Sequence, residues 1–312
     1  MTNRVVYTSD MHGNEAQFRA FVDCILEVKP SIAIIGGDIP PNGSGFARDD
    51  YIVMQRKFLT QRLPELLKPI KQVLPETQIY VIPGNDDCKV NDDIFNTYPQ
   101  LLTNVDGKRI KLPGGFREIV GYSVVPITPF RIKDREKYDL TNIPEEVVVE
   151  YAKRQRGYNL QGIVSVGDRQ NARWQGIQFR EEDKTDSIQK DLEGVLFISN
   201  SRNSVYIFHT PPNNTPLDIT KDGKHVGSFA IRYFIEKYQP FLTLHGHIHE
   251  TVDMSKEYKT KIGDSWCMSA GNHNRDSKLA VLTFDLDNPA DAERVKLPCT
   301  AFSRLIKRTF RR

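Results

Sequence analysis

The chain has 312 residues, of which 39% are hydrophobic, so it can bury a large core as one large α/β domain or as two smaller ones. Lysine and arginine number 43 and aspartate and glutamate 40, and the net charge of +3 is too small to argue for nucleic acid or an anionic membrane as a partner. No apolar run reaches the roughly 18 residues that span a bilayer, and the first residues have no cationic segment followed by a long apolar one, so neither membrane anchoring nor export is expected.

Three apolar segments in the first part of the chain have the composition of buried strands: residues 4–8, 31–35 and 78–82. A helix is predicted at 15–28, where apolar residues recur at helical spacing and Pro30 stops the pattern. Residues 50–73 form a longer amphipathic segment. The alternation of strand and helix predicts a mainly parallel sheet with right-handed crossovers.

Each of these strands ends in a glycine-containing turn that carries carboxylate, imidazole or amide side chains. The turns are at 9–14, 36–40 and 83–87. Ligands of such sheets lie outside the carboxyl ends of the strands, so we expect the three turns to face one crevice. Asn14, in the first turn, can contact a phosphate or cap the helix that follows.

The middle of the chain has a different character. Residues 109–126 predict short strands, either of a second sheet or of a continuation of the first. Residues 130–193 are densely charged with mixed sign, include a helical stretch at 144–156, and are predicted to be an insertion. This insertion is either a cap-like segment over the crevice or a surface excursion without a role in the site. Residues 187–196 are predicted to be helical and to lead back into the core.

The core pattern then resumes with a strand at 204–208 that ends at His209, another candidate ligand. A helix is predicted at 228–239, with Ser228 as its N-cap and Pro240 beyond its end.

A strand at 241–244 leads into the sequence HGHIH, which places three histidines at alternate positions. Gly246 allows the backbone to turn sharply, so His247 and His249 can approach a pair of metal ions from different sides. His245 precedes that turn, at the end of the predicted strand.

The end of the chain adds little chemistry. Residues 265–268 and 279–285 are predicted to be strands of an outer sheet. The tail at 303–312 is locally basic and is expected to be a solvated terminus. The four cysteines, Cys24, Cys88, Cys267 and Cys299, have no CxxC spacing. Disulfides and thiolate zinc sites are therefore not expected, and a cytoplasmic location is expected.

Five other polar or aromatic residues have a functional and a structural interpretation. His225 and His273 are expected to be solvated loop residues rather than catalytic groups. Arg169 and Arg173 can bind a substrate phosphate or simply carry surface charge. Trp174 can stack on a base or anchor the insertion against the core.

The strand-end turns together supply oxygen and nitrogen donors without a thiolate: Asp10, His12, Asp38, Asn85, His209, His247 and His249. This set is too hard for a structural zinc site and too large for one tetrahedral ion. It suits two adjacent divalent ions with one carboxylate as the bridge.

Five ordered segments resemble the motifs of the calcineurin-like metallophosphoesterases, of the bacterial single-domain type. They are D-x-H-G-N at 10–14, G-D at 37–38, G-N-D-D at 84–87, a lone His209 at a strand end and G-H-x-H at 246–249. The resemblance covers about residues 5–284, and the insertion at 130–193 is not explained by the general family pattern.

The resemblance implies an α/β fold of two mixed β-sheets packed as a sandwich and flanked by helices, in four layers. Residues 1–312 would form a single domain, with 130–193 as the inserted, cap-like segment. The implied reaction is hydrolysis of a small phosphate ester by a hydroxide that bridges two divalent metal ions.

The resemblance also implies which residues hold the metals, which are commonly manganese, iron or zinc, with manganese favoured. It assigns the first ion to Asp10, His12 and His249, the second ion to Asn85, His209 and His247, and the bridge to Asp38. The residues predicted to take part in catalysis are Asp38, Asn85, Asp86 and His247. His245 is expected to be a strand residue rather than a ligand, because the glycine of the family motif comes after it and only His247 and His249 fit the pattern.

Asp86 is a departure from the family pattern. Many phosphomonoesterases of the family have a histidine at this position, whereas an aspartate near two cations is a poor proton donor unless desolvation raises its pKa. A phosphodiester, nucleotide-like substrate is therefore favoured, and a phosphomonoester remains the alternative. Asp87 is a candidate for orienting a ligand histidine.

Two further alternatives remain. A nuclease has only the basic tail at 303–312 in its favour, so nucleic acid is not the expected partner. A non-enzymatic scaffold with this fold would not require the complete set of ligands that the sequence contains. The oligomeric state stays open.

Overall fold

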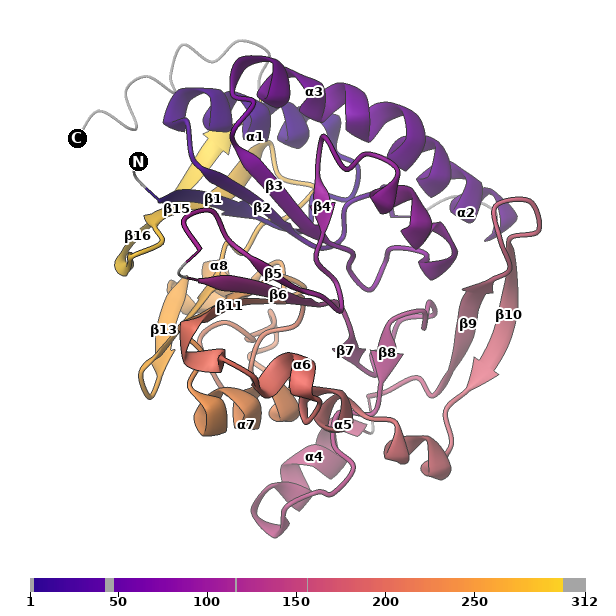
Figure 1. Cartoon of the computed structure of the whole chain (residues 1–312). Helices are drawn as coiled ribbons and strands as arrows, with labels where there is room; N and C mark the ends of the chain where they lie inside the picture. Colours follow the sequence, from indigo (N-terminus) through magenta and orange to yellow (C-terminus); the bar gives the residue numbers. More distant parts are fainter. Residues whose placement is uncertain (1–2, 43–47, 116, 156, 300–312) are drawn as a thin grey trace.

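The computed structural model describes residues 3–42, 48–115, 117–155 and 157–299. Two six-stranded β-sheets are packed face to face, and helices cover the outer face of each sheet (Figure 1). The layers are therefore helix, sheet, sheet and helix, which confirms the predicted fold class. The basic tail at 303–312 lies outside the described residues.

The first sheet has the strand order β16-β15-β1-β2-β3-β4. Its strands are β1 (Arg4–Thr8), β2 (Ile32–Gly36), β3 (Gln78–Ile82), β4 (Thr103–Asn104), β15 (Lys278–Asp285) and β16 (Asn288–Pro298). Strands β1 to β4 pair in parallel in chain order, as the alternation of strand and helix predicts, while β15 and β16 are antiparallel additions.

The second sheet has the strand order β13-β14-β12-β11-β6-β5. Its strands are β5 (Arg109–Lys111), β6 (Glu118–Tyr122), β11 (Ser204–Phe208), β12 (Leu242–His245), β13 (Lys259–Ile262) and β14 (Ser265–Ser269). The short strands expected at 109–126 thus belong to the second sheet, with the exception of β7 (Val125–Pro126).

The expectation that 265–268 and 279–285 share an outer sheet is wrong. Strand β14 lies inside the second sheet beside β12, and β15 lies inside the first sheet beside β1. The physical reason is burial, since six consecutive residues of β15 are buried and the strand therefore packs on both faces.

Alternation along the strands places side chains into different layers. In β1, Val5 and Tyr7 point into the core between the sheets, and Val6 packs against the helices of the first layer. In β11, Ile207 lies between the sheets and Phe208 packs toward the helices of the second layer. The sandwich therefore has three apolar cores, one at each interface between its four layers.

The helices of the first layer are α1 (Glu15–Val28), α2 (Arg48–Lys57) and α3 (Leu63–Val73). Asn14 is the N-cap of α1, because its Oδ1 accepts the backbone N–H of Ala16 and Gln17. A π-helical turn (Phe58–Arg62) joins α2 to α3 within the predicted segment 50–73. Pro64 explains this turn, since it cannot donate to the Thr60 carbonyl, which accepts the Tyr98 hydroxyl instead.

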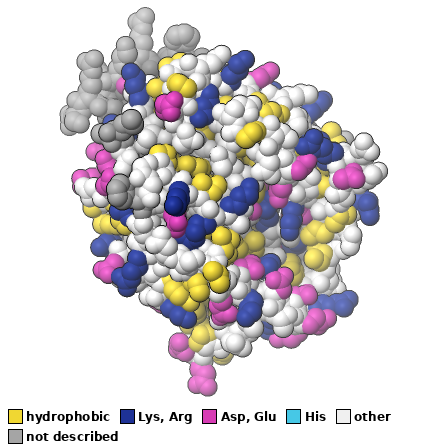
Figure 2. All heavy atoms as spheres, viewed as in Figure 1, with side chains coloured by type: hydrophobic (Ala, Val, Ile, Leu, Met, Phe, Trp, Pro, Cys, Tyr) yellow, Lys and Arg dark blue, Asp and Glu magenta, His cyan; other side chains and the backbone are white. Residues whose placement is uncertain are grey.

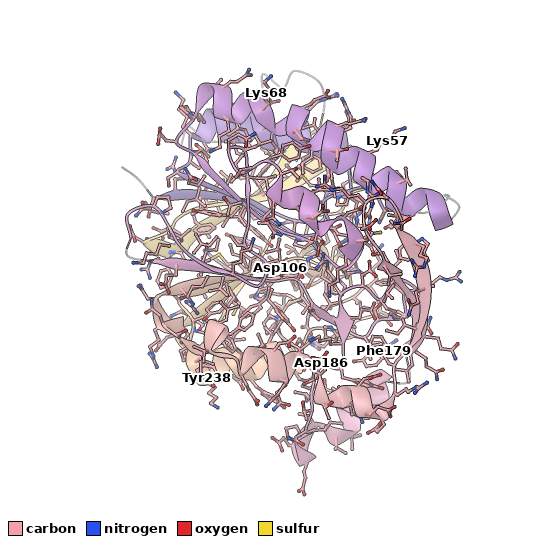
Figure 3. The ribbon with its side chains drawn as sticks, turned by 45° about the vertical axis from the view of Figure 1, so that its right-hand side comes forward. Lys57, Lys68, Asp106, Phe179, Asp186 and Tyr238 are labelled. Carbon is pink, nitrogen blue, oxygen red and sulfur yellow. The ribbon has the colours of Figure 1, made fainter. Side chains whose placement is uncertain are left out.

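The second layer is built around α7 (Phe229–Tyr238), with α5 (Ile188–Leu192) and α6 (Val195–Ile198) beside it. Ser228 is the N-cap of α7, as predicted. The two helical layers lie on opposite sides of the molecule, with Lys57 and Lys68 on one, Tyr238 on the other and Asp106 between them (Figure 3).

The remaining helical segments are short. They are the 3-10 turns Lys89–Asn96, Glu145–Val147, Glu181–Thr185 and Ser201–Asn203, and the helices α4 (Val148–Gln155) and α8 (Thr251–Ser255). Among the described residues, no helix combines the length and the apolar character needed to cross a membrane.

The insertion at 130–193 contains a structure that the sequence analysis missed. The part with Arg169, Arg173 and Trp174 forms an antiparallel hairpin of β9 (Gln161–Val166) and β10 (Arg173–Gln178). The hairpin lies beside α2 at the edge of the molecule (Figure 1). Two short parallel strands, β7 (Val125–Pro126) and β8 (Glu136–Lys137), form the base of the insertion.

The charged side chains on the surface are mixed. On the face drawn in Figure 2, lysine and arginine are interspersed with aspartate and glutamate. This pattern agrees with the net charge of +3 and shows no block of one sign on that face.

Candidate metal centre

The carboxyl ends of five parallel strands meet at one edge of the sandwich. The turns after these strands carry all seven predicted ligands: Asp10 and His12 after β1, Asp38 after β2, Asn85 after β3, His209 after β11, and His247 and His249 after β12. The first sheet contributes four of the seven residues and the second sheet three.

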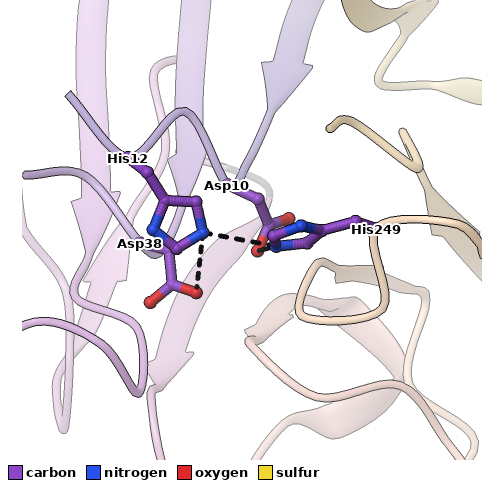
Figure 4. A group of neighbouring side chains, drawn as sticks. All are labelled: Asp10, His12, Asp38 and His249. Atoms are coloured by element: carbon purple, nitrogen blue, oxygen red, sulfur yellow. Dashed lines mark hydrogen bonds and ion pairs between the residues drawn. The ribbon is translucent and has the colours of Figure 1, made fainter. Parts of the chain in front are cut away.

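A first group of donors lies around His12 and His249. One ligand atom from each of Asp10, His12, Asp38 and His249 lies within 4.8 Å of the others (Figure 4). The Nε2 atoms of His12 and His249 are 3.3 Å apart, and Asp10 Oδ1 is 3.5 Å from His249 Nε2. The four side chains therefore point their donor atoms at a common centre.

A second group lies on the other side of Asp38. The Oδ1 atom of Asn85 is 3.1 Å from His209 Nε2 and 2.7 Å from His247 Nδ1. Asp38 Oδ2 is 3.3 Å from His209 Nε2 and 3.5 Å from His12 Nε2 of the first group. One carboxylate oxygen thus lies between the two groups of donors.

Hydrogen bonds between the turns hold these groups in place. The backbone N–H of His247 donates to Asp10 Oδ1 at 3.0 Å, and that of Asp86 donates to Asp38 Oδ1 at 2.9 Å. Asp87 does not contact a ligand histidine as considered above; its Oδ2 accepts the backbone N–H groups of Gly84 at 2.9 Å and of Ile39 at 3.2 Å. Asp87 thereby ties the turn of Asp38 to the turn of Asn85.

Four of the donors have an unusual backbone conformation. Asp10, His12, Asp38 and His247 all have positive φ, between 43° and 68°. Residues with a side chain rarely occupy this left-handed region, and such residues concentrate at functional sites. The turns accept this conformation because it aims the four side chains inward.

The charges of the site are buried. Burial alone would raise the pKa of Asp38, but His209 and His12 lower it well below its usual range. Burial lowers the pKa of His209, yet the carboxylates of Asp38 and Asp10 outweigh this effect and raise it to about 9. Burial, with the nearby His209, lowers the pKa of His247 to about 3. Two buried carboxylates therefore dominate the electrostatics and favour positive charge in the site.

The residues fit a pair of divalent cations. In the described part of the chain, the ion-pair partners of Asp10 and Asp38 are histidines rather than lysine or arginine. His209 Nδ1 lies 2.9 Å from the Gly36 carbonyl and donates to it, which leaves Nε2 as the ligand atom. Carboxylate, amide and imidazole donors are those that manganese, iron and zinc accept.

His245 is buried at the end of β12, as expected. Its Nδ1 lies 3.0 Å from the Thr210 carbonyl and its Nε2 lies 2.7 Å from the Thr243 hydroxyl. Burial lowers the pKa of His245 to about 3, so the ring is neutral. Its hydrogen bonds therefore support the strand, and it is not part of the donor groups.

Both arginines discussed above lie away from the donors. Arg169 pairs with Asp93 through Nε at 2.6 Å, and the side chain of Arg173 is exposed on β10. His273 lies with its ring centroid 5.2 Å from that of His249. Arg169 and Arg173 therefore carry surface charge and do not reach the donors. His273 lies closer to the site than expected for a solvated loop residue.

A cavity of about 640 Å³ opens above the donors. Its lining includes His12, Asp38, Asn85, Asp86, His247 and His249, together with Phe130, Ile132 and Trp174 of the insertion and Tyr51 of α2. Tyr51 was not expected from the sequence, because no local pattern indicates which face of α2 reaches the site.

Asp86 lines this cavity and is the one predicted catalytic residue that is not a predicted ligand. Burial and the negative charge of Asp38 raise the pKa of Asp86 to about 7. Cations bound beside it would stabilise the carboxylate and lower that pKa again.

Comparisons with known proteins place the chain in a family and show which folds are similar to its own. Residues 3–251 match the sequence model of the family described as calcineurin-like phosphoesterase. A dimetal phosphatase from Danio rerio has a similar fold, with 12% identity, a TM-score of 0.50 and coverage of 96% of this chain and 97% of the other. A Thermus thermophilus protein has 14% identity, a TM-score of 0.49 and coverage of 95% and 99%. A search of curated proteins finds no match.

Proposed function

The chain belongs to the calcineurin-like phosphoesterase family, and from this premise we propose that it hydrolyses a small phosphodiester with the help of two divalent cations, manganese being favoured. The observation that carries the proposal is the position of Asp38 Oδ2, 3.5 Å from His12 Nε2 and 3.3 Å from His209 Nε2. A carboxylate between two groups of donors suits a bridge between two ions.

The seven donors divide between the two ions as the family motifs imply. Asp10, His12 and His249 would hold the first ion, Asn85, His209 and His247 the second, and Asp38 both. When bound, the ions supply positive charge opposite the phosphate oxygens and lower the pKa of water so that it attacks at neutral pH.

The chain's own residues orient the donors. Asp87 fixes the turns of Asp38 and Asn85 relative to each other, and the Asp10 carboxylate accepts the backbone N–H of His247. Such fixed geometry aligns the reacting groups before the reaction starts.

The diester preference rests on Asp86. This carboxylate takes the position at which many phosphomonoesterases of the family have a histidine, and next to cations it would donate no proton to a leaving group. A diester places less demand on such an acid, because only one ester bond breaks and the cations carry most of the charge stabilisation. A phosphomonoester is the second candidate substrate.

We also propose a cap role for the insertion at 130–193 within a single domain of residues 1–312. Phe130, Ile132 and Trp174 line the cavity together with the predicted ligands, which supports the cap over a remote surface excursion. A cytoplasmic location is supported by the cysteines, all four of which are free thiols.

The test is hydrolysis by protein stripped with a chelator and then supplied with manganese. Bis(p-nitrophenyl) phosphate and p-nitrophenyl phosphate serve as the paired diester and monoester, and zinc and iron replace manganese in parallel samples. We expect diester hydrolysis that disappears with the metal and returns with it. If the metal restores hydrolysis of the monoester alone, the proposed diester preference is wrong. If neither ester is hydrolysed while two metals are bound, the proposed enzymatic activity is wrong.

A further inference from the structure

A second cavity, of about 720 Å³, adjoins the cavity above the donors. The two cavities share His247, Glu250 and Phe130 in their walls. Because His247 is a predicted ligand, the second cavity reaches the place where the phosphate would bind. The proposed phosphate site therefore borders both cavities.

The first cavity has an aromatic wall. The rings of Tyr51 and Trp174 line it with their centroids 6.1 Å apart and their planes tilted by 40°. Both rings belong to a small apolar cluster between α2 and the hairpin β9–β10, which fixes their positions. A wall of this kind suits a flat ring, because ring faces attract one another by offset stacking.

The second cavity is apolar with one positioned imidazole. Ile127, Val226 and Ile248 supply apolar surface, and His225 also lines the cavity. His225 Nδ1 lies 2.7 Å from Asp218 Oδ1 and donates to it, which leaves Nε2 as the ring nitrogen available to a ligand.

Asp218 is built to hold His225. It is fully buried, and its carboxylate also accepts the backbone N–H groups of Asn214 at 3.1 Å, Thr215 at 2.9 Å and Gly227 at 2.9 Å. Three backbone donors fix the carboxylate, and the carboxylate fixes the ring. A half-buried histidine with so rigid a partner differs from the freely solvated loop residue that the sequence analysis expected.

We infer that the substrate is a phosphodiester whose two organic groups occupy the two cavities. The first group is a flat ring that stacks against Trp174. The second is an apolar group with one polar atom that forms a hydrogen bond with His225 Nε2. This inference rests on the proposed function and adds the substrate class and two residues that determine specificity. Cavities of about 300–1,000 Å³ hold drug-sized groups, so each cavity is large enough for one arm.

A diester gains more binding energy from the two cavities than a monoester does. A monoester has one organic group and leaves one cavity to water, whereas a diester excludes water from both and gains the apolar transfer energy of the second group. This contribution to discrimination comes from the walls of the cavities. It adds to the contribution expected from Asp86 and does not depend on the protonation of that residue.

The experiment compares the diester bis(p-nitrophenyl) phosphate with the monoester p-nitrophenyl phosphate in the manganese-loaded protein. Trp174→Ala opens the first cavity and His225→Ala opens the second. Matched controls are Gln175→Ala on the same hairpin and Lys221→Ala on the same loop, both exposed side chains that line neither cavity. Thermal melting checks that each variant is folded. If Trp174→Ala does not fold, Trp174→Leu replaces it, and if His225→Ala does not fold, His225→Phe replaces it.

The measured quantity is the ratio of kcat/KM for the diester to kcat/KM for the monoester. We expect this ratio to fall by more than about fivefold in at least one of the two variants, the size of effect that a lost pocket contact gives, and to stay unchanged in both controls. A smaller fall in both variants, or an equal fall in the controls, would overturn the inference. Absence of hydrolysis by the unmutated protein is a different result, because it contradicts the proposed function itself.

Discussion

Gly84→Ala is a single added methyl group aimed at the proposed bridging carboxylate. A Cβ at this position would lie 2.2 Å from Asp38 Oδ1 and 2.3 Å from the Asp38 backbone nitrogen. The backbone of Gly84 does not have positive φ, so the strain comes from contact alone. The Asp38 turn must move by about 1 Å to restore ordinary contacts, and a misplacement of that size in a reacting geometry costs about 100-fold in rate.

The assay is kcat/KM for manganese-dependent diester hydrolysis, together with the number of metals bound per chain. We expect a fall of about 100-fold for Gly84→Ala with a protein that still folds, because overpacking of one methyl group costs about 1–3 kcal/mol of stability. The matched control is Gly176→Ala on the hairpin, where a Cβ would meet no atom within 4 Å. Full activity of Gly84→Ala with both metals bound would refute the position assigned to Asp38.

Three further substitutions test separate parts of the structure. Asp38→Asn removes the charge between the two donor groups and should lower activity at least about 100-fold and reduce metal content; full activity with two metals would contradict the bridge. Asp139→Ala removes the carboxylate that caps the start of α7 and should lower the free energy of unfolding in urea by about 2 kcal/mol, whereas an unchanged urea midpoint would mean that Ser228 suffices as the cap. Lys133→Met leaves the buried carboxylate of Glu136 without its cation and should lower the free energy of unfolding by about 3 kcal/mol. Adding Glu136→Gln should restore part of this loss, whereas additive effects of the two substitutions would show that the pair is not coupled.

Local signals fixed several elements to the residue. Strands β1, β3 and β11 and helix α1 have the predicted bounds, because apolar runs, an N-cap such as Asn14 and a stop such as Pro30 are all close in sequence. The position of the seven predicted ligands at one edge of the sandwich could be predicted for the same reason, since each lies within a few residues of a strand end.

Features that depend on distant contacts could not be predicted. The neighbours of β14 and β15 follow from how the two sheets assemble, and the sequence of either strand fits an inner or an outer place. The hairpin β9–β10 has glycine and polar residues in its strands, so its alternation is weak. Tyr51 and the partner of His225 depend on how helices and loops dock, which no short motif encodes.

The division of the donors between the sheets has a consequence for the lifetime of the protein. Asp38 belongs to a turn of the first sheet and His209 to a turn of the second, so cations held between them would fasten the two halves of the sandwich at one edge. The two sheets cannot separate at this edge before the cations dissociate, so the rate of unfolding should fall as the metal concentration rises. Degradation that starts from the opened sandwich would then respond to metal starvation, and the abundance of the chain would follow the availability of its ions.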